Sequence, residues 1–505
     1  MRAIVLSGIL VLALAVPGTA NAEKSGNSTL YRYAKDTWRS MDAMVDPGTG
    51  VPADKVTGDL RTRAKVTSPT NVGTYIWSTL TARDLRIISR HDAAARVGKV
   101  LTALERMDRH TPTGQFYNWY DPATLQLVRT WPENGDPVRL FASSVDNSWL
   151  ATALMMIRTA VPQHAARATR LVTSMNFASY YDPAARPDAG TGLMRGGFWP
   201  ERPEGCSVES DYAGTGTVVH STCHHYGAPA ETRIGQYVAI ALGQIPRESY
   251  FGPYRTFPDN ACDFGWQEQK PVGSWQRHLG VNVWEGTYGY RGMRYVPNWG
   301  GSMFEALMPD LVVPEASWAK RSWGRNHPVF VRAQIEHGMN EAAYGYWGFS
   351  PSNDPHGGYR EYGVDQLGMD EPGYTSDRER TATDPGYEGC RPAQPAPTTF
   401  GDGVVTPHAS FLALPYARSQ AMGNLAKLRA DFDAYGPGGF YDAVAVRSGV
   451  VSKWYLALDQ GMVMAALGNV LADGNMHRYF GTRAVEARLR PVMALEEWAV
   501  VPAAN

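Results

Sequence analysis

Residues 71–85 read NVGTYIWSTLTARDL, and within them Ile76, Leu80 and Leu85 recur at helical spacing. A short polar break follows near residues 90–92, and the apolar positions of residues 97–104 then repeat the pattern. Two amphipathic helices separated by such a break predict a helical hairpin. The same spacing predicts further helices at 145–160, 165–175, 231–242, 304–313, 328–344, 409–416, 419–432, 454–471 and 485–489.

The predicted helices share no fixed period or consensus, which disfavours a solenoid of regular repeats. Between them lie long segments, such as 180–228 and 348–397, that are rich in Gly, Pro, Tyr and Trp and show no sustained alternation of apolar and polar residues. Loops of this length are unusual in a compact domain unless they build a site. An all-α fold, a closed toroid of helical hairpins with its loops crowded at one end, fits these features better than a simple bundle.

The N-terminus has the three parts of a secretory signal peptide: Met1-Arg2, an apolar run to Val16, and a small-residue exit at Ala20-Asn21-Ala22. The run is shorter than the roughly 20 apolar residues of a spanning helix, so we expect cleavage before Glu23 and an extracytoplasmic protein with no integral membrane segment. No linker divides the 505-residue chain, and residues 23–505 are expected to form a single domain. The formal net charge is −1 without basic clusters, which disfavours nucleic acid and favours a neutral substrate.

The chain has four cysteines, an even number that fits two disulfides in an exported protein. We expect Cys206 to pair with Cys223 across a Gly/Ser/Thr-rich loop, and Cys262 to pair with Cys390. Metal binding by Cys223 with the neighbouring histidines 224 and 225 is the alternative.

Aromatic, carboxylate and glycine residues alternate in blocks at 346–350, 402–407, 439–442 and 459–461. Pyranose rings stack on aromatic faces, while their hydroxyl groups are bound by carboxylates, so such blocks predict a carbohydrate-binding groove. A lone Trp is more often a core residue. The aromatic residues that we predict to contact substrate are Trp119, Tyr120, Trp284, Trp299 and Trp347.

Two glutamates are candidates for acid–base chemistry, because desolvation lets a carboxyl group keep its proton. Glu231 begins an apolar helix directly after a loop rich in His and Tyr, although a first-turn glutamate also suits the helix dipole. Glu305 stands inside the almost wholly apolar run Gly300–Pro309. A buried carboxylate without a partner is costly, which favours a role in the site or a fixed partner for Glu305.

Three aspartates are further candidates. Asp442 follows the glycine pair 438–439 and Phe440-Tyr441, and Asp459 interrupts the apolar helix at 456–467; each could instead form a cap or an ion pair. Asp146 lies in Ser143–Trp149, where Ser, Asp and Asn before an apolar run are also typical of an N-cap. Asp442 is the third catalytic candidate, and we predict that Asp146 and Asp459 bind substrate.

The chain resembles the glycoamylase-like family of bacterial glycoside-active proteins, which includes endo-β-1,2-glucanases and the cleavage and transglycosylation domains of cyclic β-1,2-glucan synthases. The resemblance covers residues 70–461 and depends on the shared order of its motifs rather than on any single one. These motifs are Asn71-Val72-Gly73, Ala82–Leu85, Phe116–Asp121, Ser144–Asn147, Ala230–Arg233, Ser302–Glu305, Leu307–Pro309, Tyr346–Gly348, Phe440–Asp442 and Asp459–Gly461.

The resemblance implies an (α/α) barrel of six helical hairpins and hydrolysis or transfer of β-linked glucan without metal or other cofactor. Glu231 looks like the general acid of the family, and Glu305 looks like the second glutamate of the transglycosylating branch. The residue that helps to activate water in the hydrolytic branch looks closer to Asp442 or Asp459. Retaining and inverting chemistry both stay open, since candidates for both schemes are present.

The expected function is that of a secreted glycoside hydrolase acting on a neutral β-glucan, with β-1,2-glucan as the first choice. A glucan transglycosylase, a polysaccharide lyase and a non-catalytic secreted carbohydrate-binding protein are the alternatives. The expected partner is a polysaccharide or oligosaccharide, and the sequence leaves the oligomeric state open. Four cysteines and inserted segments at 203–223 and 368–399 depart from the family pattern and leave the glycosidic linkage open.

Overall fold

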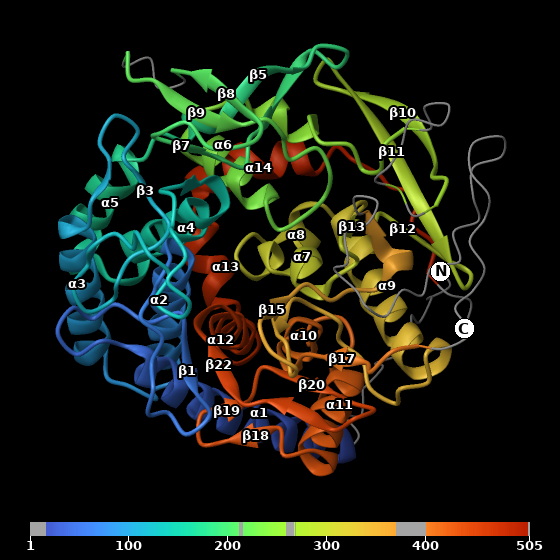
Figure 1. The fold of residues 1–505 in the computed structure, drawn as a ribbon. Coiled ribbons are helices and arrows are strands. Elements are labelled where there is room, and N and C mark those ends of the chain that lie inside the picture. Colours follow the sequence, from blue (N-terminus) through green and yellow to red (C-terminus); the bar gives the residue numbers. More distant parts are fainter. Residues whose placement is uncertain (1–16, 212–215, 259–266, 268, 370–399, 503–505) are drawn as a thin grey trace, which may run out of the picture.

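The computed structural model describes residues 17–211, 216–258, 267, 269–369 and 400–502, with side chains from residue 26 onward. Helices dominate these residues, as predicted (Figure 1). They are α1 (Pro17–Met44), α2 (Pro69–Asp84), α3 (Arg90–Arg106), α4 (Ser144–Ala160), α5 (Ala165–Ser174), α6 (Arg233–Leu242), α7 (Met303–Leu307), α8 (Glu315–Trp318), α9 (Trp323–Glu336), α10 (Pro407–Leu412), α11 (Arg418–Asp431), α12 (Ala457–Leu471), α13 (Asn475–Phe480) and α14 (Arg483–Met493).

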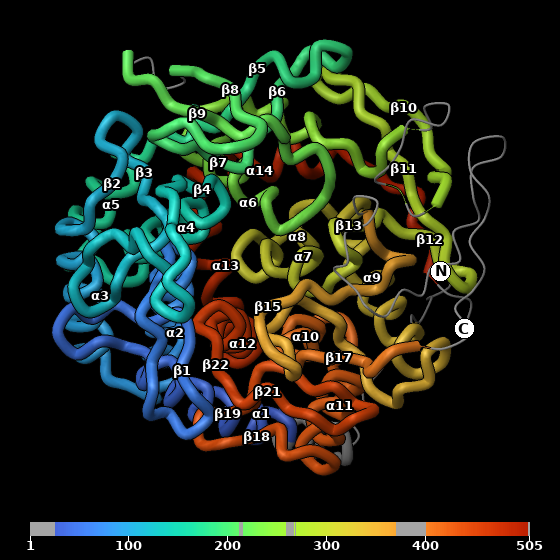
Figure 2. Tube along the Cα trace, in the orientation of Figure 1, coloured from blue at the N-terminus to red at the C-terminus, as the bar shows by residue number. Residues whose placement is uncertain are grey.

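Helices far apart in the sequence pack next to one another around a central region. α12 contacts α2, α2 contacts α4, α4 contacts α6, and α7 contacts α10, which in turn contacts α12. Hydrogen bonds from Arg233 of α6 to carbonyl oxygens of α7 join the remaining neighbours. Each of these helices also packs against one helix on the outside: α2 against α3, α4 against α5, α6 against α14, α7 against α9, α10 against α11, and α12 against α1. Figure 2 shows the N-terminal α1 beside the C-terminal α12.

The prediction of an all-α chain is wrong in one respect, because the described residues also form sheets. Most strands have two to four residues, too few for a visible alternation, and several pair with strands distant in sequence. The sheets are β1–β22 (Lys55–Thr57, Trp454–Leu456), β2–β3 (Arg109–His110, Gln115–Phe116), β4–β7–β9–β8 (Ala142–Ser143, Gly197–Trp199, Val219–Thr222, Ser207–Ser210), β5–β6 (Tyr181–Arg186, Thr191–Met194), β10–β11–β12 (Val272–His278, Val281–Tyr290, Met293–Tyr295), β13–β16 (Asn298–Trp299, Gly368–Met369), β14–β15 (Ser352–Asn353, Tyr359–Arg360), β17–β20–β21 (Val404–Val405, Ala443–Ala445, Val450–Ser452) and β18–β19 (Tyr435–Gly436, Gly439–Phe440).

The predicted disulfide between Cys206 and Cys223 is present and lies beside the β8–β9 pair. Its formation contradicts the alternative in which Cys223 binds a metal, because the thiolate is not available. The predicted partners Cys262 and Cys390 lie outside the described residues. Among the helices described, none is long and apolar enough to cross a membrane.

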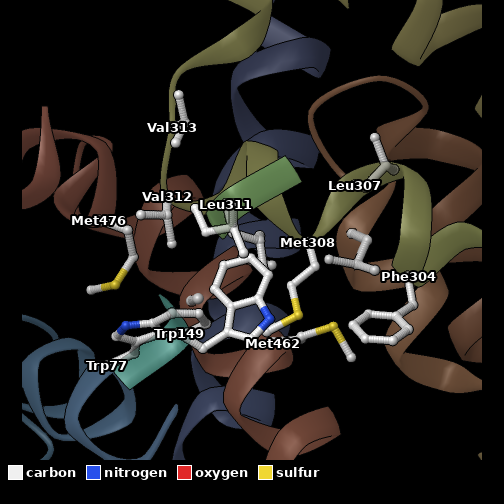
Figure 3. Packing of buried hydrophobic residues seen from close by; sticks show 14 of the residues in the cluster. Trp77, Trp149, Phe304, Leu307, Met308, Leu311, Val312, Val313, Met462 and Met476 are labelled. Carbon is white, nitrogen blue, oxygen red and sulfur yellow. The ribbon is translucent and has the colours of Figure 1, made fainter. Parts of the chain in front are cut away.

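The core at the centre of the ring is built from large side chains of several inner helices (Figure 3). Trp77 of α2 and Trp149 of α4 are both buried and pack edge to face with ring centroids 5.5 Å apart. Two glycines let the helices approach closely enough for this packing. A Cβ atom at Gly73 would lie 2.8 Å from the carbonyl oxygen of Trp149, and one at Gly461 would lie 2.3 Å from Cβ of Thr74.

We therefore expect Gly461→Ala to force α12 away from α2 and to lower the free energy of unfolding by about 1–3 kcal/mol, as overpacking does elsewhere. Gly423→Ala is the matched control, because Gly423 is also inside a helix but a Cβ there meets no atom within 4 Å. That change should raise stability by about 0.5–1 kcal/mol through helix propensity alone. Urea unfolding of both variants measures the difference, and equal effects would contradict the close approach.

Candidate active site

Several inner helices begin at the same end of the ring and carry polar side chains in their first turns. Ser68, Ser143 and Ser302 are the N-caps of α2, α4 and α7, and each accepts a hydrogen bond from the backbone N–H three residues later. Those third residues are Asn71, Asp146 and Glu305, so the cap fixes the start of each helix under a functional side chain. The N-cap reading of Asp146 is thus wrong, since Ser143 is the cap.

The first carboxyl pair consists of Glu231, just before α6, and Glu305, in the first turn of α7. The backbone N–H of Glu231 donates to Oε2 of Glu305 at 2.7 Å, which joins the two segments. The indole N–H of Trp149 donates to Oε2 of Glu231 at 2.8 Å. Glu305 is buried, whereas Glu231 keeps partial exposure. The predicted candidates Glu231 and Glu305 therefore lie side by side.

The surroundings of this pair favour protonated carboxyl groups. Burial raises the pKa of Glu231 to about 8, and the charge of Asp146 adds to the increase although the Trp149 hydrogen bond opposes it. Burial, followed by the charge of Glu231, raises the pKa of Glu305 well above its usual range. A pKa of about 8 favours a protonated Glu231 at neutral pH, and such a group can donate its proton.

The second pair consists of Asp442, which follows β19, and Asp459, in the first turn of α12. Both are buried, and their carboxyl groups lie close enough to influence each other's pKa. Burial raises the pKa of Asp442 to about 6; burial and then the charge of Asp442 raise the pKa of Asp459 well above its usual range. The backbone N–H of Asn353 donates to Asp442 at 2.6 Å.

His408, in the first turn of α10, lies behind this second pair. Its Nδ1 is 3.6 Å from Oδ1 of Asp459, and burial lowers the pKa of His408 to about 3, so the ring is neutral at ordinary pH. A neutral imidazole does not neutralise the aspartates. Because the pKa of Asp442 is raised only to about 6, we expect this carboxyl group to be ionised at neutral pH.

Tyr359 of β15 lies within electrostatic range of both pairs, since its hydroxyl interacts with Glu231, Asp442 and Asp459. Its side chain is 50% exposed, and Figure 1 shows β15 over the middle of the ring, in front of α10 and α12. Asn353 of β14 ties this hairpin to the second pair through the contact with Asp442. An exposed aromatic ring between two carboxyl pairs is suited to contact a sugar.

Asp146 lies at the edge of the first pair. Its carboxylate accepts from Thr70 Oγ1 at 2.7 Å and from Asn118 Nδ2 at 2.9 Å, and its charge acts on Glu231. Asn118 directly precedes Trp119, which is partly exposed and packs against Trp131. The roles of Asp146 and Trp119 as substrate contacts stay predictions, and both residues lie at the edge of the first pair.

Of the other predicted aromatic contacts, Trp299 lies near the first pair, because its backbone N–H donates to the carbonyl oxygen of Pro229 at 3.0 Å. Trp284 is partly exposed on β11 and donates from its indole N–H to Oγ1 of Thr256, away from the hydrogen bonds of either pair among the described residues. Tyr120 and Trp347 are buried within the hydrophobic core. The prediction that these two rings stack on substrate is corrected: their faces are covered by protein.

Sequence reasoning missed Trp149, Arg233 and Tyr359. Arg233 carries a weak signal that could have been used, since this charged residue directly precedes the mostly apolar residues of α6. Its guanidinium is buried and binds Glu315. Trp149 and Tyr359 carry no such signal, because their neighbours come from distant parts of the chain.

The described residues contain one group that could hold a metal ion by distance alone, namely Asp310, Glu315 and His327. The oxygens of Glu315 already accept hydrogen bonds from Arg233, Tyr237 and His327. Tyr416 donates to Asp310. The protein's own donors therefore account for these acids.

Two pairs of carboxyl groups at or near the starts of inner helices are the kind of acid that glycosidic bond cleavage requires. The comparisons with known proteins agree with this class of enzyme, the glycoside hydrolases. Residues 272–482 match the family model Glycoamylase, described as "Putative glucoamylase", which confirms the resemblance for that part of the chain. Residues 32–182 match DUF3131, described as a protein of unknown function.

The cyclic β-(1,2)-glucan synthase NdvB of Rhizobium meliloti is 26% identical over 294 residues, or 55% of this chain, but the match spans only 8% of that longer protein. An endo-β-1,2-glucanase of Chitinophaga pinensis, solved with sophorotriose and glucose, has a TM-score of 0.61 at 16% identity and covers 92% of this chain and 98% of its own. An endo-β-1,2-glucanase of Talaromyces funiculosus, solved with sophorose, has a TM-score of 0.59 at 14% identity, with coverage of 94% and 91%. These structures support the helical toroid.

The raised pKa of Glu231 has a consequence for stability. A carboxyl group with an ordinary value of 4.5 and a folded pKa of about 8 binds its proton more tightly when the protein is folded. Its stabilising contribution is complete below the ordinary value and is lost as the pH rises through the folded pKa.

We therefore expect Glu231→Gln to have a higher free energy of unfolding than the wild type at pH 8–9, by about 4 kcal/mol, and this advantage should shrink toward pH 4. Thermal unfolding measured across this pH range tests the expectation. Glu201→Gln, at an exposed position, is the control and should show no pH-dependent difference from the wild type. A Glu231→Gln protein less stable than the wild type at pH 9 would contradict the buried, proton-binding environment.

Proposed function

We propose that the chain is a secreted glycoside hydrolase that cleaves a neutral β-glucan, with β-1,2-glucan as its first substrate. The observation that carries the proposal is the placement of Glu231, whose pKa is raised to about 8. Its carboxyl group accepts a hydrogen bond from the Trp149 indole, and its backbone N–H donates to the carboxyl group of Glu305. A carboxyl group that keeps its proton at neutral pH is what a general acid needs. The glucanase names of the structural neighbours support the substrate class.

In the proposed mechanism Glu231 gives its proton to the glycosidic oxygen as the bond from that oxygen to the anomeric carbon breaks. The Asp442–Asp459 pair supplies the base: ionised Asp442 takes a proton from the water whose oxygen bonds to the anomeric carbon. The two pairs differ in the direction this division requires, because the pKa of Glu231 is raised to about 8 and that of Asp442 only to about 6. The half-exposed ring of Tyr359 is proposed to stack on the sugar between them.

The architecture proposed for this activity is an (α/α) barrel of six helical hairpins within residues 23–505, after removal of a signal peptide at residues 1–22. The contacts of α2, α4, α6, α7, α10 and α12 with one another, and of each with one outer helix, support this arrangement. The first turns of these inner helices would face the substrate.

Product analysis tests the proposed function directly. We expect residues 23–505 to release oligosaccharides from β-1,2-glucan in a panel that also contains β-1,3-, β-1,4- and α-linked glucans. Glu231→Gln should lower kcat by about 10²- to 10⁴-fold because the general acid is removed. Glu201→Gln, at an exposed position, should keep full activity. Retention of most activity by folded Glu231→Gln would remove Glu231 from the mechanism.

A glucan transglycosylase is the second candidate, favoured by the similarity to the cyclic β-(1,2)-glucan synthase and by the direct contact between Glu231 and Glu305. In that scheme Glu305 would act as the second carboxylate and the product would retain its anomeric configuration. The high pKa of Glu305 disfavours it as a nucleophile at neutral pH.

The configuration of the first product separates the two schemes. We expect inversion, seen by proton NMR as an α-anomeric reducing end in the first minutes of the reaction, because ionised Asp442 activates water. Asp442→Asn should lower kcat by about 10²- to 10⁴-fold. Retention, together with an active Asp442→Asn variant, would transfer the second role to Glu305.

A further inference from the structure

Behind the first carboxyl pair, one buried ion pair connects the segments that carry Glu231 and Glu305. The guanidinium of Arg233 donates from Nε to Oε1 of Glu315 at 2.7 Å and from a terminal nitrogen to Oε2 at 2.9 Å. The side chains are only 6% and 0% exposed. Such a two-point contact fixes the orientation of the planar guanidinium as well as its position.

The other hydrogen bonds of Arg233 all go to the backbone around the two glutamates. It donates to the carbonyl oxygens of Ala230 at 2.7 Å, Glu305 at 2.9 Å and Ala306 at 2.7 Å. Ala230 directly precedes Glu231, and the second carbonyl belongs to Glu305 itself. A single side chain therefore holds both glutamate-bearing segments.

Glu315 is held in turn by two more side chains. The hydroxyl of Tyr237 donates to Oε1 at 2.7 Å, and Nε2 of His327 lies 3.0 Å from Oε2. Although burial alone would raise the pKa of Glu315, the charge and hydrogen bonds of Arg233 hold it at about 2. Glu315 is thus a fixed negative charge that balances the positive charge of Arg233.

A second buried trio of Arg, Glu and Tyr serves as an internal comparison for the trio of Arg233, Glu315 and Tyr237, in which Glu315 also has His327 as a partner. Arg255 binds Glu496 through Nε at 2.7 Å, and Tyr250 donates to the same glutamate at 2.9 Å. The rings of Tyr237 and Tyr250 stack with centroids 6.1 Å apart, so the two trios are neighbours. Arg255, however, donates to the carbonyl oxygens of Pro253 and Tyr250, and no hydrogen bond joins it to Glu231 or Glu305 among the described residues.

We propose that Arg233 and Glu315 are positioning residues for the reaction, which hold Glu231 and Glu305 at their working separation and set the affinity of Glu231 for its proton. The inference rests on the proposed function, since it assigns a role relative to that general acid. The positive charge of Arg233 favours ionised Glu231, and Glu315 balances that charge. Removal of the Glu315 charge leaves Arg233 unbalanced next to a carboxyl group that must stay protonated.

Glu315→Gln and Glu496→Gln form the matched test, because both remove the charge of a fully buried glutamate held by an arginine and a tyrosine. Both should lower the unfolding temperature. In the wild type we expect the alkaline limb of the pH profile of kcat/KM near the Glu231 pKa of about 8. Only Glu315→Gln should move this limb, downward by about one pH unit. Glu496→Gln should leave that limb in place.

A readout that needs no substrate separates this inference from the proposed function. The Trp149 indole N–H, which donates to Glu231, can be followed by ¹⁵N NMR of Trp-labelled protein and assigned with Trp149→Phe. Its resonance should titrate with Glu231, and the midpoint should fall by about one unit in Glu315→Gln alone. If folded Glu231→Gln kept most of its activity, the proposed function would be overturned, but the titration of the Trp149 resonance in the other variants would be unaffected.

Equal midpoints in the wild type and Glu315→Gln, or equal shifts in both variants, would overturn the inference and leave the trio a purely structural element. If Glu315→Gln does not fold, Tyr237→Phe and Tyr250→Phe provide the milder matched pair. Each removes a tyrosine hydroxyl that donates to a buried glutamate. A shift in Tyr237→Phe alone supports the inference, and the absence of any difference between the two overturns it.

Discussion

The buried ion pair of Arg233 and Glu315 is the contact on which the candidate site depends. Removing both charges from water is costly, and the attraction between them offsets this only when every remaining donor and acceptor is satisfied. Here the remaining donors of Arg233 bind backbone carbonyls next to Glu231 and within α7, and Tyr237 and His327 bind Glu315. The geometry that satisfies the ion pair is therefore the same geometry that brings the two glutamates together.

The direction of the inner helices explains why acids gather at one end of the ring. Helix N-termini favour negative charge, and the serine caps of α4 and α7 place Asp146 and Glu305 at the third helical position. Burial acts in the opposite direction and raises the pKa of Glu231 and Asp442, but to different values, about 8 and about 6. In the proposed mechanism, the separation between these two pKa values would let Glu231 donate a proton while Asp442 accepts one.

The sequence predicted the helices and the main acids because their signals are local. Glu305 could be singled out by its apolar neighbours, and helical spacing located α2 and α4. The strands were missed because pairs such as β1–β22 join residues about 400 positions apart and are too short to alternate. Trp347 and Tyr120 were assigned to the substrate from motif context alone, and that context does not distinguish an exposed ring from a core ring. The partners of Trp149 and Arg233 likewise depend on tertiary contacts.

The low identity of the structural neighbours indicates which features the fold itself requires. A TM-score of 0.61 at 16% identity means that the chain path is kept while most side chains differ. A closed ring needs close approach between neighbouring helices, which Gly73 and Gly461 provide, and satisfied helix N-termini, which the serine caps provide. These requirements determine where the acids converge. They do not determine the glycosidic linkage, because the hairpin that carries Tyr359 reaches the acids from a loop, and loops vary more freely than the helices they connect.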